Sequence, residues 1–333
     1  MRGVGAGPNA PLVLMENYFV EKLRIVYMGS PEIAVPSLKA LAEHHNVVGV
    51  VTQPDREAGR GKKIVPPPVK EAAMALNIPV IQPERMKVPG TFEQLQEWAP
   101  DLIVVMAFGQ ILRKNVLELP RLGCLNAHAS LLPRWRGASP IQAAILHGDQ
   151  VSGVTIMQMD PGIDTGPMLR TGEIAIDPQD TTVTLSAKMA VLAAELLIET
   201  IPGYADGSIL PVPQPEEGAC YTGMISKQDG MLDFSQSAES LACKVRAYNP
   251  WPCGTFEVGG EVFKVYRAHA AENAGQAAPG TRTICQGLPA VAAADGLLVL
   301  DELQAPGKKA MPGKAFLSGY RNWLSSDGEE NKK

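Results

Sequence analysis

The sequence predicts a two-domain protein of the α/β class: a doubly wound, Rossmann-like parallel sheet followed by a small antiparallel β-barrel. At 333 residues the chain is longer than one hydrophobic core usually organises. Up to about residue 200, apolar strand-like runs alternate with helix-like runs, which is typical of a parallel sheet. After residue 217, short strand-like runs are separated by Gly-Gly and Asp-Gly turns, which favours a barrel.

Each expected strand of the first domain is a short apolar run that ends at a turn residue or before a helical pattern. Strands are expected at residues 23–28, 47–52, 80–81, 102–106, 124–128, 154–159 and 168–176. Helical periodicity predicts helices through residues 35, 38 and 41, and at residues 69–76, 92–98, 141–147 and 182–200. Asp180 is the expected N-cap of the last and longest helix.

The domain boundaries follow from these patterns. Residues 202–217 are rich in proline and glycine and are interpreted as a linker. Beyond them, strands are expected at residues 255–258, 262–266, 290–292 and 297–300, with a hairpin turn at Gly259-Gly260. The expected organisation is an N-terminal extension at residues 1–22, a first domain at 23–201, the linker, a second domain at 218–324 and a polar tail at 325–333. Met15 is a second candidate translation start.

Composition excludes several classes of protein. The net charge is −5, with 30 basic against 35 acidic residues, so a polyanion must be bound by a local basic patch and not by the overall field. The five cysteines form no C-x-x-C pair and predict neither a zinc site nor a disulfide framework. No apolar run is long enough to span a bilayer, and the first residues lack the features of a signal or transit peptide. We therefore expect a cytoplasmic protein without a metal.

A group of polar side chains follows the apolar strand at residues 124–128. Asn126 and His128 are two residues apart, so on an extended chain both side chains lie on one face, at the edge where α/β enzymes keep their chemistry. A histidine at a strand end is often only a hydrogen-bonded structural residue. Here a proline- and glycine-punctuated loop follows, and a second turn at residues 160–166 carries Asp164. An aspartate in such a turn also often bonds only its own backbone.

This pattern resembles the methionyl-tRNA formyltransferases, within the wider family of enzymes that use 10-formyltetrahydrofolate. The shared pattern consists of Asn126, His128, the sequence SLLP at residues 130–133, and Asp164 in a G-x-D-T-G turn. On its own it indicates only the wider family.

Segments outside this pattern narrow the resemblance to the tRNA enzymes. They are the basic loop at residues 53–63, the Asn-Pro-Trp-Pro sequence at 249–252 and the segment 306–311. The resemblance runs from about residue 23 to about residue 323 and implies that the second domain is an OB-like barrel. One departure is Cys253, where relatives commonly carry glycine.

The resemblance implies transfer of a formyl group from 10-formyltetrahydrofolate to the free amino group of initiator methionyl-tRNA, giving N-formylmethionyl-tRNA for translation initiation. Asn126 would donate an amide N–H to the developing oxyanion, and His128 would take the proton that the amine sheds. Asp164 would orient His128 or hold a water near the folate nitrogen. The folate contacts implied by the family are Met106, Ala107, Gly109, Ser130, Leu131, Leu132 and Pro133.

The basic loop is implied to enter the tRNA acceptor stem, where phosphates set the affinity. Arg60 is the expected key residue, although a charge run in a loop is usually only solvated surface. The implied tRNA contacts of the loop are Arg56, Arg60, Lys62 and Lys63, and a second patch in the barrel domain contains Lys308 and Lys309. The expected partners are thus tRNA and folate, with no membrane and no obligate protein partner.

Two alternatives remain open. A sugar-nucleotide or glycinamide ribonucleotide formyltransferase would share Asn126, His128 and Asp164, but would not require the basic loop or the barrel domain. A non-catalytic RNA-binding protein with a relic first domain would not need the three polar residues intact.

Overall fold

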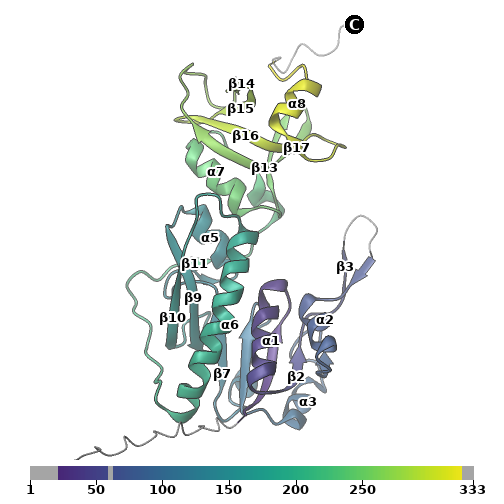
Figure 1. Ribbon diagram of the computed structural model, residues 1–333, viewed down its shortest axis with the longest axis vertical. Helices are drawn as coiled ribbons and strands as arrows, with labels where there is room; N and C mark the ends of the chain where they lie inside the picture. The colour runs from purple at the N-terminus through teal and green to yellow at the C-terminus, as the bar shows by residue number, and fades with distance from the viewer. Residues whose placement is uncertain (1–21, 59–62, 325–333) are drawn as a thin grey trace, which may run out of the picture.

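The computed structural model describes residues 22–58 and 63–324. The first domain is built on a seven-stranded sheet with the order β10-β9-β7-β6-β1-β2-β5 (Figure 1). Its strands are β1 (Arg24–Gly29), β2 (Asn46–Val51), β5 (Val80–Ile81), β6 (Leu102–Met106), β7 (Cys124–His128), β9 (Val151–Gln158) and β10 (Met168–Ala175). The expected extension up to residue 21 and the expected tail at 325–333 lie outside the described residues.

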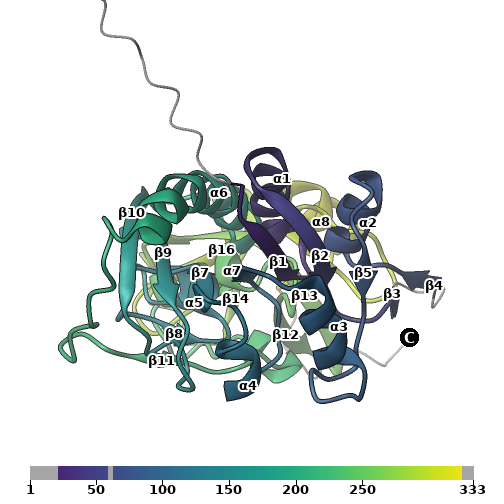
Figure 2. The same cartoon turned by 90° about the horizontal axis from the view of Figure 1, so that it is seen from below.

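Helices cover both faces of this sheet, as expected for a doubly wound fold. Figure 2 shows α1 and α6 along one face and α3 and α4 along the other. In β1, Ile25 and Tyr27 pack into the core under α1 and α6, whereas Val26 and Met28 pack into the opposite core. The helices of the domain are η1 (Glu32–Ala34), α1 (Val35–His44), α2 (Pro68–Ala75), α3 (Thr91–Trp98), α4 (Lys114–Leu117), α5 (Pro140–Leu146) and α6 (Thr182–Asp206).

The sheet is mixed, which corrects the prediction that it is parallel throughout. β5, β2, β1, β6 and β7 pair in parallel, but β9 is antiparallel to β7, and β10 is antiparallel to β9. A short turn without a helix joins β9 to β10, and such a connection is too short for the crossover that parallel strands need. The strand positions were predicted correctly, but alternation of strands and helices does not fix their direction.

The last helix of the domain also differs from the prediction. α6 continues through Pro202 to Asp206, into the segment interpreted as a linker. Its N-cap is Thr181, whose hydroxyl accepts the Thr184 N–H, and not Asp180. The Asp180 carboxylate instead accepts hydrogen bonds from the Lys188 ammonium at 2.6 Å and the Thr184 hydroxyl at 2.8 Å. Burial opposes ionisation of Asp180, but these bonds and one from the Asp177 N–H lower its pKa.

The second domain is an open antiparallel barrel with the strand order β12-β13-β16-β15-β14, and β17 pairs with β16. The predicted hairpin turn is confirmed, because Val258 pairs with Glu261 across Gly259 and Gly260, both at positive φ. Two helices of this domain, α7 and α8, were not predicted. The elements are η2 (Lys227–Gly230), α7 (Ala238–Ala247), β12 (Gly254–Val258), β13 (Glu261–Ala271), β14 (Arg282–Cys285), β15 (Leu288–Ala292), β16 (Leu297–Gln304), β17 (Met311–Pro312) and α8 (Gly313–Gly319).

An aromatic cluster fills this barrel, and α7 joins it to the first domain. Phe256 and Phe316 each contact the buried Trp323 edge to face, with ring centroids 6.3 and 5.5 Å apart. At the end of α7, Ala247 packs into the core of the first domain, and Arg246 donates to the Asp180 carbonyl at 3.1 Å. Across residues 22–58 and 63–324, no helix combines the length and apolar character that a bilayer crossing requires.

His45 is expected to make the fold sensitive to acid. It follows α1, its side chain is 5% exposed, and its Nδ1 has no hydrogen-bond partner in the described part of the chain. Burial, with smaller contributions from His44 and Lys22, lowers the pKa of His45 below its usual value of 6.5. The unfolded chain therefore binds more protons than the folded one, so the free energy of unfolding falls as the pH falls below about 6.5.

We expect His45→Gln to flatten this decline when urea unfolding is measured between about pH 7 and pH 5. The neighbouring His44 is exposed, and its Nδ1 lies 2.9 Å from the Ala40 carbonyl oxygen, so His44→Gln is the matched control and should retain most of the decline. An unchanged pH dependence in His45→Gln would show that another group is responsible.

Candidate functional site

β7 delivers two polar side chains to the carboxyl edge of the sheet. Between them, Ala127 packs into the core beneath α6, so Asn126 and His128 lie on the other face of the strand. The same-face relation expected from their spacing is confirmed. β6, which pairs with β7, and β1, which pairs with β6, run parallel to β7 and end at the same edge.

The turn after β9 brings a carboxylate to these two residues. Asp164, with a left-handed φ of 52°, accepts the Asn126 Nδ2–H at Oδ1 over 3.3 Å. Its Oδ2 accepts the Gly137 N–H at 2.8 Å and lies 3.6 Å from Nδ1 of His128. The structure thus brings Asn126, His128 and Asp164 together.

The alternative that Asp164 only bonds its own turn does not hold. A different carboxylate, Asp160, makes those bonds: it accepts the Gly162 N–H at 3.0 Å and the Thr165 hydroxyl at 2.8 Å. The turn is therefore stabilised from within by Asp160. The Asp164 carboxylate is left to point out of the turn toward β7.

The hydrogen bonds of His128 fix which ring nitrogen is free. Nε2 lies 3.0 Å from the Trp135 carbonyl oxygen, and the side chain is only 5% exposed. A carbonyl oxygen can only accept, so Nε2 must carry a proton in the neutral ring. Nδ1 is then unprotonated and faces Asp164. The imidazole ring thus lies between the Trp135 carbonyl at Nε2 and the Asp164 carboxylate at Nδ1.

The loop between β7 and α5 is packed from inside. Ser130 is fully buried and donates to the Arg134 carbonyl at 2.6 Å, and Leu132 is buried with its N–H on the Thr155 hydroxyl at 3.1 Å. Leu131 and Pro133 are half-buried. Of the four expected folate residues in this loop, only Leu131 and Pro133 have partly exposed side chains, whereas Ser130 and Leu132 are buried.

The turn after β6 exposes main chain. Ala107 and Gly109 are exposed at positive φ, and Gln53 donates to the Phe108 carbonyl between them at 3.0 Å. The Met106 side chain is only 1% exposed and accepts a bond from Ser37 in the core. Any contact of Met106 with a ligand must therefore use its backbone.

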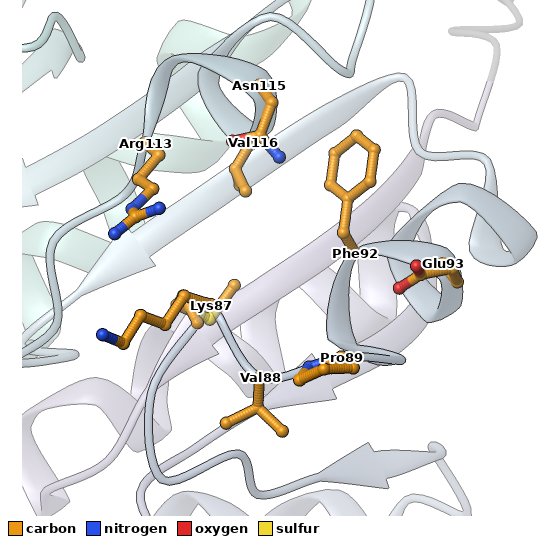
Figure 3. Close-up of a pocket in the computed structure, with 9 residues that line it drawn as sticks. Lys87, Val88, Pro89, Phe92, Glu93, Arg113, Asn115 and Val116 are labelled. Carbon is orange, nitrogen blue, oxygen red and sulfur yellow. The ribbon is translucent and has the colours of Figure 1, made fainter.

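A pocket of about 340 Å³ opens beside this turn (Figure 3). Gln110 links the turn to it by accepting the Met86 N–H at 2.8 Å and donating to the Pro83 carbonyl at 3.1 Å. In Figure 3, Lys87 and Arg113 extend toward the same end of the pocket. The lining residues are Met86, Lys87, Val88, Pro89, Phe92, Glu93, Arg113, Asn115 and Val116.

The segment of the basic loop contains β3 (Arg56–Ala58) and β4 (Lys63–Val65), which pair as an antiparallel hairpin. In Figure 1 these strands project away from the sheet of the first domain. Arg56 and Lys63 lie on these strands and are exposed, whereas Arg60 and Lys62 are outside the described residues. At its base Asp55 accepts bonds from Gln82 and Lys70, both at 2.7 Å, and these bonds lower the pKa of Asp55.

The second expected basic patch is on the surface of the barrel domain. Lys308 and Lys309 are exposed in the turn between β16 and β17, and Gln304 bonds the Lys308 carbonyl. In the described residues no group of three His, Cys, Asp or Glu side chains is arranged to hold a metal ion.

Three groups at the site were not anticipated from the sequence. They are the Trp135 carbonyl that bonds His128, the Gly137 N–H that bonds Asp164, and Gln214, which contacts the Asp164 turn. The first two are backbone groups, which leave no trace in residue type. Gln214 lies in the proline-rich stretch interpreted as a linker, where no pattern marks it.

Two family models match this chain. Residues 23–201 match the family model described as formyl transferase, and residues 224–321 match the model of the formyl transferase C-terminal domain. The chain is 48% identical over 300 residues to "Methionyl-tRNA formyltransferase" of Myxococcus xanthus, covering 90% of this chain and 95% of that protein. The chain belongs to the methionyl-tRNA formyltransferase family. A second family member, from Pelobacter propionicus, is 46% identical and covers 89% of this chain and 92% of its own.

Solved structures of more distant proteins share the fold. HypX from Aquifex aeolicus in complex with tetrahydrofolic acid superposes with a TM-score of 0.63 at 16% identity, covering 94% of this family member but only 50% of the longer HypX chain. WlaRD, a sugar 3N-formyl transferase in the presence of dTDP and 5-N-formyl-THF, gives a TM-score of 0.62 at 19% identity over 87% of this chain and all of its own.

Proposed function

We propose that this protein transfers the formyl group of 10-formyltetrahydrofolate to the free amino group of initiator methionyl-tRNA in the cytoplasm. The product is N-formylmethionyl-tRNA for translation initiation. The observation that carries the proposal is likeness along almost the whole chain, with 48% identity to a relative of that name over 90% of this chain. The cluster of Asn126, His128 and Asp164 supplies the groups that this chemistry needs.

Asn126 stabilises the tetrahedral intermediate. One N–H of its amide donates to Asp164, and the second N–H has no partner among the described residues. That second N–H is the donor for the formyl oxygen as negative charge develops on it. The bond to Asp164 holds the amide in the required orientation before substrate arrives.

His128 and Asp164 handle the proton. The amine nitrogen of the aminoacyl group attacks the formyl carbon, and Nδ1 of His128 accepts the proton that the amine sheds. Asp164, 3.6 Å away, stabilises the imidazolium. The bond between the formyl carbon and N10 of the folate then breaks, and the same proton passes to N10. Atoms and charges balance without a metal or any further reactant.

The donor site is proposed to follow the turn after β6. The exposed backbone at Ala107 and Gly109 offers hydrogen bonds to a pterin, with Leu131 and Pro133 against its rings. Met106, Ser130 and Leu132 then act by shaping these segments, because their side chains are buried.

Acid gel electrophoresis, which separates formylated from unformylated methionyl-tRNA, tests the proposal. The purified chain is incubated with initiator methionyl-tRNA and 10-formyltetrahydrofolate, with uncharged tRNA as the control. We expect formylation that depends on both substrates. A folded protein that leaves methionyl-tRNA unmodified but formylates an amino-sugar nucleotide would overturn the proposal.

Arg60 is proposed to contact tRNA phosphate at the acceptor stem, with Arg56, Lys62 and Lys63 beside it. Arg60→Ala should lower kcat/KM for methionyl-tRNA by about tenfold and reduce the slope of log affinity against log salt by about one. Arg170→Ala is the control, because it removes an exposed cation of β10 that pairs with Glu199. Equal salt slopes in Arg60→Ala and wild type would remove Arg60 from the interface. Lys308 and Lys309 are proposed to form a second phosphate contact.

A further inference from the structure

We propose that Gln214 is a positioning residue that holds the Asp164 turn in its active geometry. The inference rests on the proposed formyl transfer and adds a residue that the sequence pattern of the site does not contain. Gln214 lies between α6 and β11 (Tyr221–Thr222), in the chain segment that leads to the barrel domain. Among the described residues its side chain bonds to Arg136, Asp164 and Gly166, and it would act through Asp164.

The Gln214 amide bonds to two carbonyls in the second half of the turn at residues 160–166. Its Nε2 donates to the Asp164 carbonyl at 2.8 Å and to the Gly166 carbonyl at 2.7 Å. Asp164 has a φ of 52°, a left-handed conformation that an aspartate adopts only at a cost. Two hydrogen bonds to the carbonyls at and after this residue stabilise that backbone.

A buried arginine fixes the orientation of the Gln214 amide. Nε of Arg136, a residue only 4% exposed, donates to Oε1 of Gln214 at 3.0 Å, and its Nη1 donates to the Tyr221 hydroxyl at 3.1 Å. A guanidinium can only donate, so Oε1 must face it and Nε2 must face the two carbonyls. Both halves of the amide are thus used, and a flipped amide would oppose donor to donor and acceptor to acceptor.

The backbone around Gln214 is held on both sides. Before it, Val212 exchanges two hydrogen bonds with Met168 at 2.7 and 2.8 Å. After it, β11 pairs in parallel with β8 (Arg136–Gly137), the strand whose Gly137 N–H bonds the Asp164 carboxylate. Gln214 is therefore placed by the same elements that surround the carboxylate it supports.

This arrangement predicts a loss of turnover without a loss of binding. Without the two bonds the turn can relax, and a shift of about 1 Å in a reacting group costs on the order of 100-fold in rate. Substrate contacts in the turn after β6 and in the β3–β4 hairpin are made by other segments, so KM should change little.

Gln214→Glu is the informative variant, because a carboxylate can still accept from Arg136 but cannot donate to the two carbonyls. We expect kcat to fall by about 10- to 100-fold with both KM values within about twofold of wild type. Gln214→Met, of similar length and without hydrogen bonds, should show the same split if Gln214→Glu folds poorly. Gln150→Glu is the matched control, because Gln150 donates to one carbonyl, that of Gly148, at an exposed turn.

A double-mutant cycle with Asp164→Asn separates positioning from general stability. If Gln214 acts through the Asp164 carboxylate, Gln214→Glu should cost much less in single-turnover rate when Asp164 is already asparagine. Fully additive losses, or a wild-type kcat in both Gln214 variants, would overturn the inference. Absence of formylation by the wild-type chain would instead be a failure of the proposed function.

Discussion

Replacing His128 with alanine is expected to lower kcat for formylation by about two to four orders of magnitude, the range that a positioned proton acceptor supplies. The Nε2–H of His128 donates to the Trp135 carbonyl, so Nδ1 is the ring nitrogen that can accept a proton, and it faces Asp164. Folate binding should change little, because the donor is proposed to lie along the turn after β6. Single-turnover rates on methionyl-tRNA, with folate affinity measured by calorimetry, test both parts.

The barrel domain offers a matched control for this variant. His269 also pairs with an aspartate, with Nδ1 3.0 Å from Asp301 Oδ2, but on an exposed strand of the second domain. His269→Ala should leave the rate of the chemical step at the wild-type value. A His128→Ala enzyme whose rate is within about threefold of wild type would rule out a role as the proton acceptor.

Asn126→Ala is expected to reduce kcat by about 100- to 1,000-fold, the usual effect of removing one oxyanion donor. The reduction should appear in kcat and kcat/KM together, because the amide contacts the reacting oxygen only as charge develops. Asn126→Asp should be at least as damaging, since it places a second carboxylate beside Asp164 and removes both N–H donors.

The measurement is steady-state kinetics in both substrates. If Asn126→Ala raises KM for folate while kcat stays at the wild-type value, the amide binds ground state and transition state alike. Its role would then be donor binding and not stabilisation of the intermediate. Melting temperatures of both variants would identify any effect that comes only from loss of folding.

Side-chain periodicity was a sound guide to the strand that carries the site. The alternation of Asn126, Ala127 and His128 placed the two polar residues on one face, as the structure has them. The partner carboxylate was found from the turn motif, because nothing in periodicity relates Asp164 to Asn126 across a sequence separation of 38. Backbone partners such as the Trp135 carbonyl depend on the folded path of the loop and cannot be read from side chains.

The errors share a physical origin in local reasoning. The proline- and glycine-rich composition predicts a linker from Pro202, but packing of α6 against the sheet keeps the helix intact to Asp206. Helix α7 was missed although Ser237 caps it and Leu241 and Val245 form an apolar stripe. The departure at Cys253 proved informative, since this residue has a φ of 75°, where glycine is the unstrained choice.

The pairing of β8 with β11 has a consequence for anyone who recombines halves of related proteins. The Ala138 N–H bonds to the Thr222 carbonyl, and the Ser139 N–H bonds to the Thr222 hydroxyl. The segment that supports Gly137 therefore extends along the chain as far as Thr222. A crossover placed after Asp206, where α6 ends, would pair β8 of one protein with β11 of the other. A crossover placed just after Thr222 would keep β8 and β11 from the same protein.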